Sequence, residues 1–311
     1  MLCVACAPVM RQARLDSAQP PSERELQSAE NARRCHSRWA LLFPGLTQIC
    51  QGRTTEGAVL AGLGAAELGA AVGVRLAGSH NDAARDLPLL AYGDALTLSV
   101  TDAILELQRG ARLPYVPQES LTDLVRAPFA RDIVSRPEVW AGIAGTLAAG
   151  LLVSRLVDGP YDTRNAGKRP VLFGNQMNSA VGYPLAGAIG VTLFEHVALA
   201  EETTFRGLLQ SGWARTSGET RGWIYGSLAF GVLHASNIFF MDSSQRLKYL
   251  AIGVPFITVL GSYLGLAYRW NGYSLGPPVA IHFWYDFLLE AVGFIADPKN
   301  SPLALSFSLP F

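Results

Sequence analysis

The chain has 311 residues, of which half are apolar and only 16% are charged. A soluble domain usually carries roughly a quarter charged residues, so this composition indicates a membrane protein. The net charge is zero and no basic block with interleaved aromatic residues occurs, which excludes nucleic acid as a partner. Membrane lipids are the first partners to expect.

Residues 1–56 are predicted to form a cytoplasmic N-terminal tail. The segment after Met10 is rich in arginine and glutamate, and Pro20 and Pro21 interrupt any continuous helix. The tail ends in a short apolar stretch, 39–50, which contains Pro44 and is too short to cross a bilayer. We interpret this stretch as an interfacial or re-entrant segment.

All four cysteines lie in this tail, at Cys3, Cys6, Cys35 and Cys50. A structural zinc site needs four well-spaced ligands, and the spacing of Cys3 and Cys6 alone is a weak signal. We expect unpaired thiols without a function.

Seven apolar runs follow, each close to the roughly 20 residues that a membrane-spanning helix needs. They lie at about 57–77, 87–107, 139–157, 180–200, 222–240, 249–268 and 275–295. The fold class is therefore an all-α membrane protein with about seven transmembrane helices. We divide the chain into the tail, two additional helices with a loop (57–137), a catalytic core (138–296) and a C-terminal tail (297–311).

Arginine is more frequent in the segments that share a side with the N-terminus. The opposite side carries chiefly Arg155, Arg164, Lys168 and Arg169. The positive-inside rule therefore favours a cytoplasmic N-terminus in a multi-pass protein of the cell membrane, which in a bacterium is the inner membrane.

Ionisable side chains are costly inside a bilayer, so each one in a span is a candidate for function. The fourth run ends with Glu201 and Glu202, and Arg206 follows one helical turn later. This spacing lets Glu202 pair with Arg206, while Glu201 points about 100° away and stays available for chemistry.

The fifth and seventh runs each contain a histidine within a predicted membrane-spanning helix. Phe230 and His234 are one turn apart in the fifth run, and His282, Asp286 and Glu290 share one helical face in the seventh. A carboxylate in a site of low dielectric can take a proton from water, and imidazoles can stabilise an oxyanion. These residues could instead be buried polar pairs that lock helices together, but their number favours a hydrolytic site.

Three motifs occur in order on successive late runs, and together they resemble those of the CPBP intramembrane proteases, which include the CAAX prenyl endopeptidases. They are Glu201-Glu202-x-x-x-Arg206, Phe230-x-x-x-His234 and His282-x-x-x-Asp286. The resemblance covers roughly residues 139–295. It implies a helical bundle with a conical active-site cavity and an endopeptidase that acts on a peptide or protein with a membrane-associated segment.

The resemblance also implies a role for each residue. Glu201 would be the general base that activates water, and His234 would hold and polarise that water. His282 and the residue at position 286 would form the oxyanion hole, where the best-known members have asparagine. Here the residue is Asp286, and an ionised aspartate cannot donate to an oxyanion. It must either be protonated or orient His282.

Glu201, His234 and His282 could also bind zinc, the one cofactor that we consider. No His-Glu-x-x-His helix is present, and the resemblance points to a glutamate-type protease, so we favour no metal. Glu195 lies seven residues before Glu202 on the same face, and we expect it to support the site together with Glu290 of the seventh run. His196 is expected at a helix interface.

A second set of ionisable residues lies in the first two runs, at Glu67, Arg75, Asp94 and Asp102. We expect these residues to have a structural role. Two alternatives to an endopeptidase stay open: an inert relative that binds a membrane partner or confers bacteriocin immunity, and a proton-coupled transporter. The gathering of the carboxylates at one site disfavours the transporter.

Overall fold

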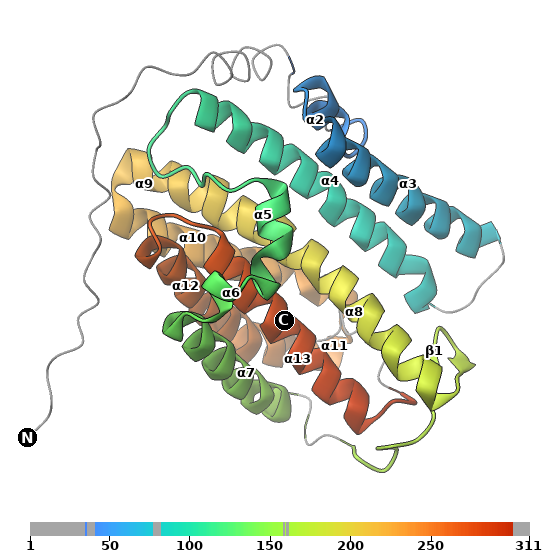
Figure 1. The fold of residues 1–311 in the computed structure, drawn as a ribbon. Helices are drawn as coiled ribbons and strands as arrows, with labels where there is room; N and C mark the ends of the chain where they lie inside the picture. The colour runs from blue at the N-terminus through green and yellow to red at the C-terminus, as the bar shows by residue number, and fades with distance from the viewer. Residues whose placement is uncertain (1–34, 36–40, 77–81, 158, 160–161, 301–311) are drawn as a thin grey trace, which may run out of the picture.

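The computed structural model describes residues 35, 41–76, 82–157, 159 and 162–300, and these form a bundle of helices (Figure 1). Its longer elements are α3 (Thr54–Leu76), α4 (Asp82–Gly110), α7 (Pro137–Val157), α8 (Ser179–Glu202), α10 (Glu219–His234), α12 (Val254–Trp270) and α13 (Gly276–Ala296). The shorter helical elements are α2 (Leu46–Cys50), α5 (Leu121–Arg126), η2 (Ala127–Phe129), α6 (Arg131–Val134), η3 (Thr203–Gln210), α9 (Ser211–Ser217), η4 (Ala235–Phe240), α11 (Ser243–Lys248) and η5 (Tyr249–Gly253). In the described part of the chain, β structure is limited to one short hairpin of β1 (Val171–Leu172) and β2 (Asn175–Gln176).

Five helices in the described residues are long and apolar enough to cross a membrane. They cover Thr54–Leu76, Pro137–Val157, Ser179–Ser217, Ser243–Trp270 and Gly276–Ala296. The chain is therefore an all-α membrane protein. The other two predicted runs coincide with α4, which carries several acidic residues, and with α10, which has only 16 residues. The count of seven spans is not confirmed.

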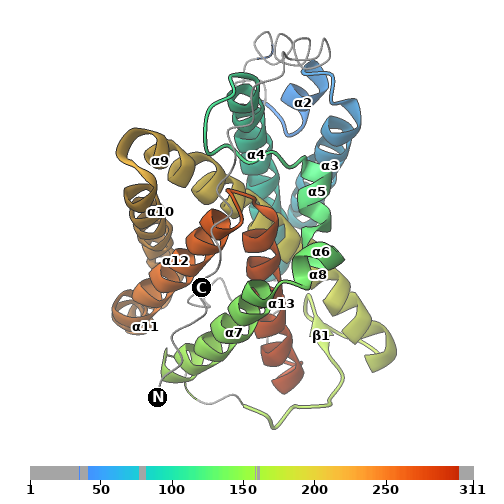
Figure 2. The same cartoon turned by 60° about the vertical axis from the view of Figure 1, so that its left-hand side comes forward.

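The helices that follow α7 form the centre of the bundle. Helix α13 packs between α7 and α8, and α10 packs along α12 (Figure 2). Helix α3 packs against α4, and α4 connects this N-terminal pair to α8 and η3. The N-terminal pair therefore lies beside the central helices.

A buried carboxylate fastens the N-terminal elements together. Oδ2 of Asp102 on α4 accepts hydrogen bonds from Nη1 of Arg53 at 2.6 Å and from Nε2 of Gln48 on α2 at 2.9 Å. Glu67 does not join this network, because it pairs with Nε2 of His196 on α8 at 3.1 Å. Asp102 and Glu67 therefore belong to separate contacts, and Nη1 of Arg75 donates to the carbonyl oxygen of Ala71 on its own helix.

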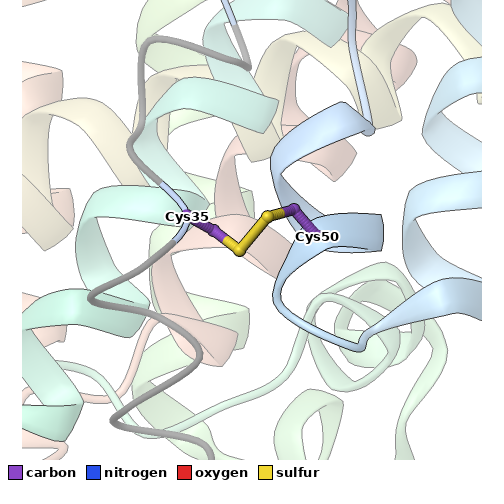
Figure 3. Close-up of a disulfide and its surroundings, with 2 residues drawn as sticks. All are labelled: Cys35 and Cys50. Carbon is purple, nitrogen blue, oxygen red and sulfur yellow. A yellow bond between two sulfur atoms is a disulfide. The ribbon is translucent and has the colours of Figure 1, made fainter.

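Cys35 and Cys50 form a disulfide, which corrects the expectation that the cysteines are unpaired (Figure 3). The short helix α2 ends at Cys50 and brings it next to Cys35, a contact that the spacing of the cysteines does not reveal. Cys3 and Cys6 lie outside the described residues, as do residues 39–40 of the predicted interfacial segment. Residues 41–50 of that segment form turns and then α2.

Candidate active site

The site begins where α8 changes its helical geometry. The α-helix ends at Glu202 and continues as the π-helical segment η3. Stretches of π-helix are rare and often occur at functional sites, because the extra residue in each turn redirects the side chains. Glu202 is completely buried at this point, whereas the side chain of Glu201 is 25% exposed.

Glu201 faces a small cavity of about 110 Å³ inside the bundle. Residues of α8, α10, η4, α12 and α13 line it: Val197, Glu201, Phe230, His234, Asn237, Ile257, Leu260, His282, Tyr285 and Asp286. The four residues that the sequence predicts as catalytic, Glu201, His234, His282 and Asp286, therefore lie around one cavity.

The carboxylate of Glu201 lies between two imidazoles. Its Oε1 is 3.7 Å from Nε2 of His234, and its Oε2 is 3.8 Å from Nε2 of His282. Both distances are too long for a direct hydrogen bond, and polar groups at such a separation often share a water molecule. A water beside Glu201 and His234 could hydrogen-bond to both.

The ring of His234 is oriented by its own helix. Nδ1 lies 2.7 Å from the carbonyl oxygen of Phe230, one turn earlier on α10. A hydrogen on Nδ1 donates to this carbonyl, which leaves Nε2 directed at the cavity. The ring of Phe230 packs against His234 at 4.5 Å between centroids, and the guanidinium of Arg206 lies 4.3 Å from the centre of the same ring.

Glu202 and Arg206 form a buried ion pair, with Nη1 of Arg206 donating to Oε1 of Glu202 at 2.9 Å. The same oxygen lies 2.7 Å from Nδ1 of His282 on α13. Nη2 of Arg206 donates to the carbonyl of Gly261 on α12 at 2.9 Å. This network joins three helices and fixes the position of His282, a contact that the spacing of the motifs does not reveal.

Asp286 lies one turn after His282 on α13. Its Oδ2 is 3.2 Å from Nε2 of His282, and its side chain is 16% exposed at the cavity. The ring of His282 is thus in contact with a carboxylate at each nitrogen. This arrangement agrees with the alternative in which Asp286 orients His282.

Two residues predicted to support the site, Glu195 and Glu290, do not line its cavity. Glu195 lines a different cavity of about 450 Å³ together with His196, next to residues of α3 and α5. Glu290 is buried one turn beyond Asp286 and does not line the small cavity. Helical periodicity shows which residues share a face of a helix, but it does not show which neighbouring helix that face contacts. The positions of Glu195 and Glu290 relative to the cavity could therefore not be predicted.

Three polar residues near the cavity were not predicted from the sequence. Asn237 and Tyr285 line it, and Tyr249 hydrogen-bonds to Asn237 and to the backbone of His234. Asn237 follows His234 by three residues, which was the one available signal. Tyr285 is adjacent to Asp286, yet its position on the helix gave no reason to select it.

Within the described ranges, no three side chains of His, Cys, Asp or Glu are arranged so that they could hold a metal together. The predicted zinc set of Glu201, His234 and His282 shares this cavity without forming such a group.

Residues 184–288 match the family model described as type II CAAX prenyl endopeptidase Rce1-like. The match covers less than half of the chain, and it shows that this segment is similar to the Rce1-like proteases. The matched segment contains all three motifs, from Glu201 to Asp286, and the resemblance to the CAAX proteases is confirmed. The proteases of this family are embedded in membranes and act on peptides. No curated protein and no solved structure matches the chain.

Proposed function

We propose that the protein is an intramembrane endopeptidase in which Glu201 activates water to hydrolyse a peptide bond in or next to the membrane. The observation that carries this proposal is the position of Glu201, whose carboxylate lies between the imidazoles of His234 and His282 at a cavity inside the bundle. The similarity of residues 184–288 to the Rce1-like proteases supports the choice of a peptide as substrate.

We propose a reaction in which each of these residues has a defined part. Glu201 takes a proton from a water that is also held by Nε2 of His234, and the resulting hydroxide attacks the carbonyl carbon of the peptide. The carbonyl oxygen becomes an oxyanion in the tetrahedral intermediate. Glu201 then returns the proton to the amide nitrogen as the carbon–nitrogen bond breaks, which releases a carboxylate and an amine.

Two further parts of the proposal concern the surroundings of the reaction. We propose that hydrolysis needs no metal ion, because the carboxylate and imidazoles can activate water themselves. We also propose that the N-terminus is cytoplasmic, with the protein in the cell membrane. The higher frequency of arginine in the segments that share a side with the N-terminus supports this orientation.

The decisive experiment compares the wild type with Glu201→Gln, which keeps the size of the side chain but removes the basic carboxylate. Both proteins are purified and incubated with a farnesylated peptide that ends in a CAAX sequence. In parallel, membranes that contain either protein are searched by mass spectrometry for new C-termini. We expect cleavage by the wild type, none by Glu201→Gln, and equal amounts of both proteins in the membrane.

The outcomes of this experiment distinguish the proposed protease from a binding relative and test the choice of substrate. Full cleavage by Glu201→Gln would refute the mechanism. If the wild type generates no new C-terminus and leaves the peptide intact, the protein is a binding relative of the proteases. Cleavage of membrane proteins without cleavage of the farnesylated peptide would retain the endopeptidase and reject a prenylated substrate.

A further inference from the structure

The cavity contains a polar side chain that the mechanism above does not use. Asn237 lies on η4, directly after the end of α10 at His234, and lines the cavity together with Glu201 and His282. A side-chain amide is an effective donor to a developing oxyanion. Whether the amide of Asn237 can donate to an oxyanion depends on its orientation.

Two hydrogen bonds define the orientation of this amide. The hydroxyl of Tyr249 donates its single hydrogen to the carbonyl oxygen of His234 at 2.9 Å. The same hydroxyl must then accept from Asn237, whose Nδ2 lies 3.0 Å away. An amide nitrogen carries two hydrogens, so one remains for another acceptor. Asn237 is thus anchored by one N–H and keeps the other.

The proposed reaction lacks a donor at the position where an oxyanion forms. An ionised Asp286 cannot donate. The ring of His282 contacts Glu202 through Nδ1 and Asp286 through Nε2, so both nitrogens already face carboxylates. The hydroxyl of Tyr285 lies against Gly150 of α7, where an added Cβ would be 2.9 Å from it. These three side chains are poorly placed to stabilise an oxyanion.

We infer that Asn237 donates its second N–H to the oxyanion of the tetrahedral intermediate, in the place that Asp286 cannot fill. This assignment rests on the proposed endopeptidase function. It makes Asn237 a catalytic residue, with Tyr249 as the group that positions it. The chain thereby places His234, which holds the water, and the donor Asn237 on consecutive elements, since η4 follows α10.

The same amide could instead serve only to fasten η4 to η5 through Tyr249. The two roles differ in their dependence on the residue at position 286. If Asn237 supplies a missing donor, an asparagine at position 286 can replace it. A fastening role would gain nothing from a new amide on α13. The double variant Asn237→Ala/Asp286→Asn therefore separates the two.

The experiment measures kcat and KM for wild type, Asn237→Asp, Asn237→Ala and the double variant, on any peptide that the wild type cleaves and Glu201→Gln does not. We expect Asn237→Asp and Asn237→Ala to lower kcat by about 100- to 1,000-fold with little change in KM, as for other oxyanion donors. The kcat of the double variant should be at least ten-fold higher than that of Asn237→Ala. Asn175→Asp, the same change on the exposed β hairpin, should leave kcat unchanged.

Tyr249→Phe provides a second test, because it removes the anchor and leaves the amide. It should lower kcat less than Asn237→Ala does. The melting temperatures of all variants show whether a loss of kcat comes from unfolding of the protein. The inference fails if Asn237→Asp or Asn237→Ala retains kcat within three-fold of the wild type, or if the double variant recovers nothing. If the wild type cleaves no peptide at all, the proposed function fails and this assignment falls with it.

Discussion

Oε1 of Glu202 lies 2.7 Å from Nδ1 of His282, and this contact joins α8 to α13 across 80 residues of sequence. The same oxygen accepts a hydrogen bond from Arg206, and all three side chains are buried. Because Nδ1 of His282 faces Glu202, the ring directs Nε2 toward Glu201 and Asp286. Glu202 therefore positions His282 in addition to pairing with Arg206.

Replacing Glu202 by glutamine tests this positioning role. The amide retains the shape of the side chain but removes the negative charge, so Arg206 is left as an uncompensated buried cation and His282 loses its charged partner. We expect both a lower melting temperature and at least a ten-fold loss of kcat. Glu201→Gln is the matched control, because Glu201 is partly exposed at the cavity and should keep its melting temperature. Equal melting temperatures for both variants would contradict the argument.

Arg206→Ala removes the cation from the same network. Arg206 is 1% exposed, and its loss also leaves the carbonyl of Gly261 without its donor. Breaking a buried ion pair costs about 3–5 kcal/mol, so the amount of folded protein in the membrane and its activity should fall together. Arg215→Ala serves as the control, since Arg215 contacts Pro114 near the surface and should accumulate normally. Wild-type abundance and melting temperature for Arg206→Ala would refute this prediction.

The helices and the catalytic motifs could be predicted from the sequence because both depend on local information. Apolar runs predict helices of membrane-spanning length. Ionisable residues within these runs are candidates for function, because their burial in a bilayer costs free energy. Contacts between distant helices could not be predicted in this way. The spacing of Glu202 and Arg206 indicates their pairing, but the rotation of α13 that brings His282 to Glu202 depends on packing around the whole bundle. The same limit explains the unexpected position of Glu195 beside α3 and α5.

Close contact between α10 and α12 depends on glycine at position 231. A Cβ on Gly231 would overlap Oγ1 of Thr258 and lie 2.9 Å from its Cβ, so the helices would have to separate. Small residues at such crossings allow membrane helices to pack. Gly231→Ala should therefore lower stability by about 1–3 kcal/mol, measured by thermal unfolding in detergent. Gly145→Ala on α7, where an added Cβ meets nothing within 4 Å, should be neutral or better. A neutral Gly231→Ala would show that the crossing adjusts freely.

The disulfide of Cys35 and Cys50 allows a test of the proposed orientation. Disulfides persist in oxidising compartments and are reduced in the cytosol. A cytoplasmic N-terminus predicts that this pair is reduced in intact cells and reacts with a maleimide without added reductant, whereas the disulfide of the structure predicts protection. The measurement uses a Cys3→Ser/Cys6→Ser variant so that only this pair can react. Protection that disappears on addition of reductant would place this face of the protein outside the cytoplasm and reverse the orientation.

Chelation tests whether a metal takes part in the reaction. In the proposed mechanism the carboxylate of Glu201 takes the proton from water, so removal of divalent ions should leave activity unchanged. A zinc-activated water would be lost together with its metal. Purified wild-type protein is incubated with 1,10-phenanthroline, dialysed, and assayed on the peptide that it cleaves, with the metal content measured in the same sample. Loss of activity that zinc restores would make Glu201, His234 and His282 metal ligands and would reject Glu201 as an independent base. Retained activity in a metal-free sample would leave the carboxylate as the group that activates water, in agreement with its position between the two imidazoles.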